Sequence, residues 1–317
     1  MLEDTPHPFH DLDGVHEVYR AWRRVADLYP GDRALIGEVW MPEVERFANY
    51  LRPDELHAAF NFDFLGCAWD AGLMRACVDR TLHAHAAVGA PATWVLSNHD
   101  VTRHVTRYGR ELTTFSFDNN LDGTPVDLEL GTRRARAAAL LSLSLPGATY
   151  VYQGDELGLW ENENIPPEQF VDPMWERRGH SRDGCRVPLP WSSDEQPFGF
   201  SPPDATAPPW LPQPAEWKDR TVQAQTGDPS SMLELYRAAI ALRRREPGLH
   251  SPAMTWLPSA PDTLAYARGD DFACVVNMSG SAIELPEYQT CLLASSPLDG
   301  ALLPQDTAVW LRLRNRG

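Results

Sequence analysis

The chain has 317 residues, of which 43% are hydrophobic and 23% are charged, so we expect a globular protein with a sizeable buried core. Its formal charge of −16 would repel nucleic-acid phosphates and anionic lipid surfaces, which excludes nucleic acid and membranes as expected partners. No apolar run approaches the roughly 20 residues of a membrane-spanning helix, and the N-terminus does not resemble a signal peptide, so we predict a soluble cytoplasmic protein.

Helical and strand patterns alternate over the first half of the chain. The first helix is amphipathic, and its apolar positions, which recur every three or four residues, are Val15, Val18, Trp22, Val25 and Tyr29. Further helices are predicted at 43–51, 68–88 and 132–145, and strands at 34–39, 58–65, 92–98 and 148–154. Strands that alternate with helices in this way predict a parallel sheet built from β/α units.

The second half of the chain changes character twice. Between residues 161 and 227 the periodicity gives way to Pro, Gly, Trp and charged residues, and a loop of this length typically covers an active site. A helix follows, capped by Asp228 and ending near Arg245. After Pro252, short runs bounded by turn residues predict a small antiparallel β domain. We expect an α/β domain over 1–249, including the loop, and a β-sandwich-like domain over 250–317.

Glu38 is a single carboxylate that follows the apolar stretch at 34–37. In a parallel β/α barrel, functional side chains lie at the C-terminal ends of the strands, where the loops begin. Glu38 occupies such a position. Considered alone, it is more simply interpreted as a solvated loop residue.

A second polar cluster, Asn98, His99 and Asp100, ends the strand at 92–98. The strand ends of Glu38 and Asp100 are two β/α units apart, so both carboxylates would face the same axial cavity. Cleavage of a glycosidic bond needs paired carboxylates, one protonated to release the leaving oxygen and one ionised. The alternative is that this cluster forms an Asx-type cap on the following helix.

Four separated motifs, IGEVW, LSNHDVTRH, PGATYVYQGDELGL and SRDGCRVPLPW, resemble in order and approximate spacing those of the alpha-amylase superfamily. They are most similar to its bacterial alpha-glucosidase and oligo-1,6-glucosidase branch. The resemblance implies a (β/α)8 TIM barrel followed by a C-terminal β domain. It also implies retaining hydrolysis of alpha-glucosidic bonds in a pocket for one terminal glucose.

The resemblance assigns roles to four residues of this chain. Glu38 matches the general acid/base, and Asp100 matches the residue that stabilises the transition state. His99 matches a ligand of the sugar hydroxyls, and Arg182 matches an arginine that closes the glucose pocket. For Arg182 the alternative is an ion pair with an acid of its own loop, such as Asp183 or Glu161.

The chain departs from the family pattern before Glu38. The resemblance requires a nucleophilic aspartate at the end of the fourth barrel strand, but Asp4, Asp11 and Asp13 do not follow an apolar run that could form a strand. We therefore expect only the C-terminal half of the barrel, strands five to eight, and no activity of the isolated chain. Its exposed barrel edges would require a missing N-terminal half or self-association.

Neither a cofactor nor a metal is expected, because the five cysteines form no C-x-x-C pair and His83 and His85 face different sides of a predicted helix. The expected partner is an alpha-glucoside or oligosaccharide substrate. Two alternatives stay open. Sucrose or trehalose isomerases and glucosyl transferases share these motifs, and the chain could also be a non-catalytic sugar-binding remnant.

Overall fold

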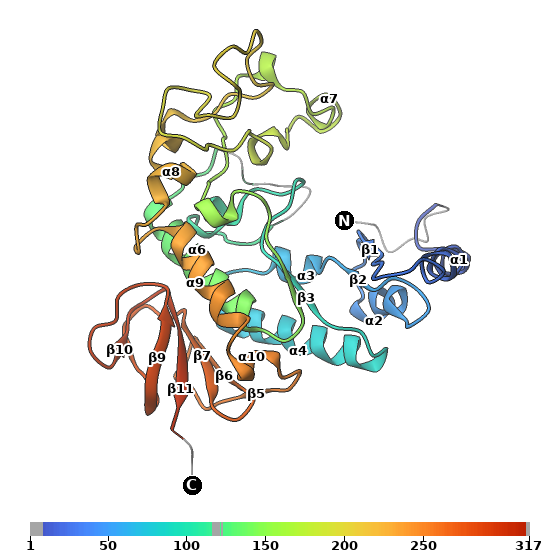
Figure 1. Ribbon diagram of the computed structural model, residues 1–317, viewed down its shortest axis with the longest axis vertical. Helices are drawn as coiled ribbons and strands as arrows, with labels where there is room; N and C mark the ends of the chain where they lie inside the picture. The colour runs from blue at the N-terminus through green and yellow to red at the C-terminus, as the bar shows by residue number, and fades with distance from the viewer. Residues whose placement is uncertain (1–8, 116–120, 122, 315–317) are drawn as a thin grey trace.

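A computed structural model of the protein describes residues 9–115, 121 and 123–314 (Figure 1). The helices are α1 (Val15–Ala26), α2 (Val44–Ala48), α3 (Phe62–Gly66), α4 (Ala71–Ala87), α5 (His104–Tyr108), α6 (Leu128–Ser144), α7 (Met174–Arg178), α8 (Val222–Gln225), α9 (Met232–Arg243) and α10 (Pro247–His250). The strands are β1 (Ile36–Gly37), β2 (Ala58–Ala59), β3 (Thr93–Val95), β4 (Ala148–Tyr150), β5 (Met254–Trp256), β6 (Thr263–Arg268), β7 (Phe272–Asn277), β8 (Ile283–Glu284), β9 (Tyr288–Ala294), β10 (Leu302–Leu303) and β11 (Thr307–Leu313).

The α/β part contains two short parallel strand pairs. Strand β1 pairs with β2, with Ile36 opposite Ala58, and β3 pairs with β4, with Thr93 opposite Ala148. The Thr93 hydroxyl donates to the Ala59 carbonyl at 2.6 Å, which connects the two pairs. The predicted order of β/α units is therefore present, although each strand is shorter than its sequence pattern.

The predicted strand at 58–65 is wrong in its second half. After β2 the chain turns into helix α3, because the Asn61 side chain accepts a hydrogen bond from the Phe64 backbone N–H at 3.0 Å. An Asn in this position is a strong helix N-cap. The predicted cap of the last long helix is also wrong, since Ser231, and not Asp228, accepts from the backbone of α9.

The C-terminal strands form an antiparallel sheet of order β5-β6-β7-β11-β9, beside the short pair β10-β8. This outcome confirms the prediction of an antiparallel C-terminal sheet. One face of the sheet packs on α6, and the two share the largest apolar cluster of the described residues. Trp310 lies in this contact fully buried, and its indole N–H donates to the Leu140 carbonyl of α6 at 3.1 Å. In Figure 1, α6 and α9 lie between the sheet and the loops at the opposite end of the molecule.

The 161–227 segment is more ordered than its sequence predicts. It includes α7, α8 and several 3-10 turns. It also contributes to a second apolar cluster, in which Ile165, Val187, Phe198, Leu211 and Trp217 are buried. Pro and Gly interrupt helical periodicity here, but they do not prevent apolar side chains from gathering into a small core.

Helix α1 places its apolar residues unusually. Trp22 is 56% exposed and Val25 is 54% exposed, and Val18 is also exposed, while Tyr19 packs on a small N-terminal cluster. The amphipathic helix predicted from the sequence is present, but much of its apolar stripe faces solvent. Among the described residues, no helix combines the length and apolar character that crossing a bilayer requires.

Candidate active site

Glu38 directly follows β1, at the C-terminal end of the strand. The Phe60 backbone N–H donates to the Gly37 carbonyl at 3.1 Å, which extends the pairing with the neighbouring segment up to this point. The preceding residue Gly37 and the following residue Val39 are buried, whereas Glu38 is exposed. The alternation of a strand therefore directs the Glu38 carboxylate out of the core and into the open end of the strand pair.

Residues 98 to 100 combine a turn with two outward side chains. The alternative of an Asx-type cap on the following helix is wrong, because no side chain of this cluster caps α5. Instead, the Asp100 backbone N–H donates to Asn98 Oδ1 at 2.9 Å, which forms an Asx turn inside the cluster. Asn98 alone satisfies this turn. His99 and Asp100 are consequently free to face the Glu38 carboxylate.

The structure brings Glu38, His99 and Asp100 together, although they come from two different strand ends. One ligand atom from each of the three side chains lies within 4.8 Å of the others. His99 Nε2 is 3.6 Å from Asp100 Oδ1, and the His99 side chain is 54% exposed. Two carboxylates and an imidazole at this spacing can contact the same sugar ring.

Two arginines hold the Asp100 carboxylate. Arg182 Nη1 donates to Asp100 Oδ1 at 2.7 Å, and Arg186 Nη2 donates to the same oxygen at 2.9 Å. Arg186 Nε also donates to the His99 carbonyl at 2.7 Å. The Asp100 carboxylate and the His99 backbone are therefore held by the 161–227 segment. Charge-assisted bonds of this kind are among the strongest in proteins.

Arg182 is itself held by Asp172. Its Nε and Nη2 donate to the two oxygens of Asp172, each at 2.8 Å, and its backbone N–H donates to Asp172 Oδ2 at 2.9 Å. The hydrogen bonds from Arg182 hold the pKa of Asp172 well below its usual range, and the same pairing raises the pKa of Arg182. Arg182 therefore bridges its own loop and Asp100, and the predicted alternative of an ion pair with an acid of its own loop is present, with Asp172 as the partner.

The partner predicted for the loop ion pair was wrong. Asp183 accepts hydrogen bonds from the backbone N–H groups of Val171 and Asp172 at 2.8 and 3.0 Å. Glu161 accepts from the Arg103 backbone N–H at 2.9 Å. Both acids therefore shape the loop.

The turn that carries the two arginines is packed tightly against the start of the loop. A Cβ added at Gly184 would lie 2.7 Å from the Asn162 carbonyl oxygen, so only glycine fits. The Asn162 backbone N–H donates to the Gly184 carbonyl at 3.2 Å. This close approach positions Arg182 and Arg186 on either side of the glycine.

Arg186 and Asp172 were not predicted as site residues from the sequence. Arg186 had a signal, because it follows Arg182 by four residues within the SRDGCRVPLPW motif. Asp172 had none, because it lies ten residues before Arg182 in an irregular segment and meets it only in three dimensions.

A buried polar group lies behind the site. His104 Nδ1 and the Ser97 hydroxyl are 2.8 Å apart, and Asp155 lies 3.6 Å from His104 Nδ1 and 3.7 Å from Arg103. Burial raises the pKa of Asp155 to about 7 and lowers the pKa of His104 to about 3. These residues connect β3, α5 and the segment after β4, and so support the strand end that carries Asp100.

The cluster of Glu38, His99 and Asp100 has the spacing of metal ligands. Its surroundings disfavour a cation, however, because two guanidinium groups lie within 2.9 Å of Asp100 Oδ1. The residues are better suited to sugar hydroxyls, which can accept from the arginines and donate to the carboxylates.

Asp11 and Asp13, two of the aspartates considered for the nucleophile, have structural contacts. Arg46 Nε donates to Asp11 at 2.7 Å, the Tyr50 hydroxyl donates to Asp11 at 2.5 Å, and Arg46 also bonds Asp13 at 3.0 Å. Asp4 lies outside the described residues. Asp11 and Asp13 therefore anchor the start of the chain to the region around α2.

Comparison with known proteins shows which family the chain resembles. The model of the alpha-amylase catalytic domain matches residues 2–251. A probable alpha-glucosidase of Rhizobium meliloti is 33% identical over 283 residues, covering 85% of this chain and 47% of that protein. A glucan 1,6-alpha-glucosidase of Streptococcus pneumoniae is 23% identical over 325 residues, covering 88% of this chain and 56% of that protein. The chain thus spans about half the length of the curated relatives it matches.

Solved structures show the same fold. The alpha-glucosyl transfer enzyme XgtA superimposes with a TM-score of 0.76 at 27% identity, over 96% of this chain and 55% of that one. An isomaltulose synthase from Erwinia rhapontici superimposes with a TM-score of 0.76 at 21% identity, over 95% of this chain and 58% of that one. The family model, the relatives and the shared fold agree: the chain belongs to the alpha-amylase family.

Proposed function

We propose that this chain carries the acid/base side of a retaining alpha-glucosidase site, which releases terminal alpha-linked glucose from maltose or isomalto-oligosaccharides. Glu38 is the general acid/base and Asp100 stabilises the transition state. His99 and Arg182 bind hydroxyls of the terminal glucose. The observation that carries the proposal is the convergence of Glu38, His99 and Asp100 within 4.8 Å, although Glu38 and Asp100 are 62 residues apart in the sequence.

The chemistry follows from the positions of these side chains. Glu38 protonates the leaving oxygen as the glycosidic bond breaks, and then deprotonates the water that enters. Positive charge develops at the anomeric carbon in the transition state, and the Asp100 carboxylate stabilises it. Arg182 and Arg186 keep Asp100 in position during the reaction.

A retaining reaction also needs a nucleophilic carboxylate about 5 to 5.5 Å from the acid. We propose that this aspartate comes from a polypeptide segment outside residues 9–314, and that β1 to β4 correspond to barrel strands five to eight. Under this proposal residues 1–249 form the partial barrel and residues 250–317 the β-sandwich-like domain. The exposed apolar stripe of α1, including Trp22 and Val25, supports a contact with that other segment.

A glucosyl-transfer enzyme is the second candidate. It is supported by XgtA, a transfer enzyme that is 27% identical and covers 96% of this chain. Transfer and hydrolysis share the first half of the reaction, so the residue roles are unchanged. The two differ in the acceptor that Glu38 deprotonates, which is a sugar hydroxyl in transfer and water in hydrolysis.

The test compares the chain alone with a joined enzyme, in which the N-terminal segment of the Rhizobium meliloti relative precedes this chain. With p-nitrophenyl alpha-glucoside, we expect no turnover by the chain alone. We expect turnover by the joined enzyme, and its loss in Glu38→Gln. If the chain alone turns over the substrate and Glu38→Gln abolishes that turnover, the claim that the nucleophile lies outside residues 9–314 is refuted. A folded joined enzyme without activity would refute the assigned roles.

Product analysis separates the two candidates. The joined enzyme, supplied with maltose, should release glucose as the main product if it is a hydrolase. Tri- and tetrasaccharides as main products would establish transfer. With sucrose, formation of an isomeric disaccharide would identify an isomerase.

A further inference from the structure

Side-chain contacts between α3 and α4 run in opposite directions along the two segments. Asn61, the N-cap of α3, donates through its Nδ2 to Thr81 Oγ1 of α4 at 3.0 Å. Two residues further on, Asp63 Oδ2 accepts from Arg80 Nη2 at 2.8 Å. As the chain advances through α3, its partners therefore move toward the start of α4.

Cys67 and Cys77 continue this series of contacts. Cys67 directly follows α3, and Cys77 lies about one helical turn before Arg80 in α4. The two thiols are hydrogen-bonded to each other. Cys67 is partly exposed, whereas Cys77 is only 1% exposed, so solvent reaches one thiol and the other lies behind it. We propose that this thiol pair is an oxidation site, at which hydrogen peroxide converts Cys67 and Cys77 into a reversible intramolecular disulfide.

The two thiols differ in their readiness to ionise. The hydrogen bond from Cys77 lowers the pKa of Cys67. The charges of Arg80 and Arg107 lower this pKa further, while burial and the charge of Asp63 oppose them. The same hydrogen bond, together with burial, raises the pKa of Cys77. Because the thiolate is the form that attacks a peroxide, Cys67 is the sulfur that reacts first.

The oxidation proceeds in two balanced steps. The Cys67 thiolate attacks one oxygen of hydrogen peroxide, the O–O bond breaks, and a sulfenic acid and a hydroxide ion form. The Cys77 sulfur then attacks the Cys67 sulfur, the S–O bond breaks, and the sulfenic hydroxyl leaves as water with the proton of the Cys77 thiol. The peroxide is reduced, and the two sulfurs are oxidised to one disulfide. The contact between the thiols allows the second step without a large movement of the backbone.

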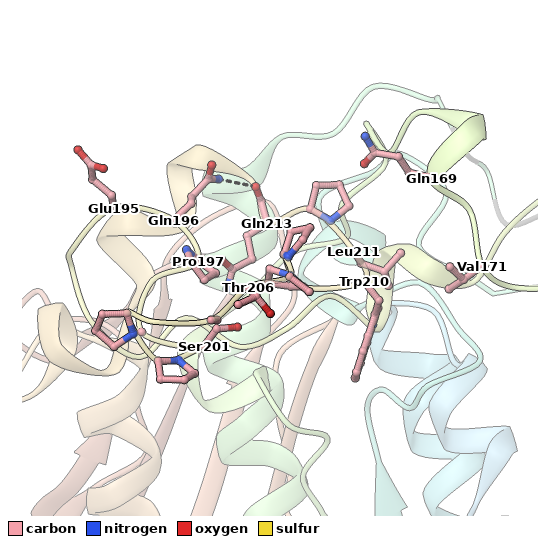
Figure 2. A pocket seen from close by; sticks show the side chains of 18 of the residues that line it. Gln169, Val171, Glu195, Gln196, Pro197, Ser201, Thr206, Trp210, Leu211 and Gln213 are labelled. Carbon is pink, nitrogen blue, oxygen red and sulfur yellow. Dashed lines mark hydrogen bonds between the residues drawn. The ribbon is translucent and has the colours of Figure 1, made fainter.

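The thiol pair lies near the candidate active site in the chain. Helix α3 begins with Phe62, whose ring stacks on that of Trp40 at a centroid distance of 3.4 Å, and Trp40 follows Glu38 by two residues. A disulfide between the end of α3 and α4 would therefore restrain the helix that contacts Trp40. The 161–227 segment encloses a separate groove, shown in Figure 2, and neither cysteine is among the residues that line it.

The test treats the reduced chain with hydrogen peroxide, alkylates the remaining thiols in denaturant and maps the peptides by mass spectrometry. We expect a disulfide that joins the peptides of Cys67 and Cys77, and its loss on treatment with dithiothreitol. Cys67→Ser should abolish this crosslink. In Cys77→Ser, the oxidation of Cys67 should stop at a sulfenic acid that dimedone traps. Cys291→Ser is the matched control, because Cys291 is exposed on strand β9, and it should leave the crosslink unchanged.

The proposal is overturned if Cys67 and Cys77 are alkylated separately in the treated wild type, or if Cys67 pairs with Cys291 instead. Thermal unfolding gives a second measurement. Because a disulfide restrains the unfolded chain, the oxidised wild type should unfold about 5 °C above the reduced protein, and Cys67→Ser should show no such shift. A lower unfolding temperature after crosslinking would show that the two sulfurs do not meet in the folded chain, which also overturns the proposal. Neither measurement involves turnover, so both are independent of the glucosidase assay.

Discussion

The helix α1 region and the C-terminal sheet use the same kinds of apolar side chain in opposite ways. Trp310 of the sheet is fully buried against α6 and lies 5.7 Å from Phe272, ring centre to ring centre. Trp22 of α1 is 56% exposed, and its ring makes an edge contact with Tyr19. The comparison indicates that the fold of this chain is stabilised mainly around α6 and the sheet, while α1 retains an apolar surface for another contact.

Polar contacts hold α1 in place. His16 Nδ1 lies 2.7 Å from Glu55 Oε2, and Arg20 Nη2 lies 3.2 Å from Glu55 Oε1. Arg23 also donates to the Glu55 backbone carbonyl at 3.2 Å. The fully buried Glu55 carboxylate is therefore the anchor of the helix, in place of the broad apolar contact that anchors the sheet.

The largest difference should appear when the two tryptophans are removed. Trp310→Ala should lower the free energy of unfolding by about 3–5 kcal/mol, because it leaves a cavity between the sheet and α6. Trp22→Ala should change it by less than about 0.5 kcal/mol. Urea unfolding of both variants measures this. Equal losses would contradict the contrast between the two regions.

The buried Asp155 makes the stability of the protein depend on pH. Burial raises the pKa of Asp155 to about 7, above its unfolded value of about 3.9, so the folded state binds the extra proton. This contribution to stability is complete below the unfolded pKa, and it is lost as pH rises toward 7. The wild type should therefore lose stability relative to Asp155→Asn as pH rises from 5 to 8, by about 2–3 kcal/mol.

Thermal unfolding of both proteins across this pH range tests the prediction. His104, whose pKa is lowered by burial to about 3, is neutral in the folded protein across this range, so the change with pH in the difference reports on Asp155. A difference in Tm that does not vary with pH would show that Asp155 is ionised throughout the range.

A smaller and more local effect is expected at the α1 anchor. Glu55→Gln removes the charge that pairs with His16 and Arg20, at a cost of about 1–2 kcal/mol. Amide hydrogen exchange should become faster in α1 and remain unchanged in α6. Faster exchange in both helices would show that α1 is integrated into the main core, which would contradict its separate anchoring by Glu55.

The sequence predicted those elements whose signals are local. The order of β/α units, the antiparallel C-terminal sheet and helix α1 all follow from periodicity and turn residues. The prediction of a strand after Ala59 was wrong because the apolar run FDFL is compatible with either a strand or a helix. The N-cap by Asn61 favours the helix. Helix α5, which has five residues, was too short for periodicity to reveal.

At the candidate site, the sequence indicated Glu38 and Asp100 but not the residues that hold Asp100 in place. The positions of Glu38 and Asp100 after apolar strands led to the expectation that they face one cavity, and the structure places them together. The bridge from Asp172 through Arg182 to Asp100 depends on how an irregular segment folds back over the strands. No sequence period carries that information, so Asp172 and the small core of the 161–227 segment required the structure.

The central claim is that Glu38 donates the proton to the leaving oxygen, and the leaving-group dependence of the joined enzyme tests it most directly. In Glu38→Ala, hydrolysis of maltose, whose leaving group needs protonation, should fall by about 10²–10⁴-fold. Glycosyl-enzyme formation from 2,4-dinitrophenyl alpha-glucoside, whose leaving group needs no proton, should fall far less. An equal loss with both substrates would contradict the account.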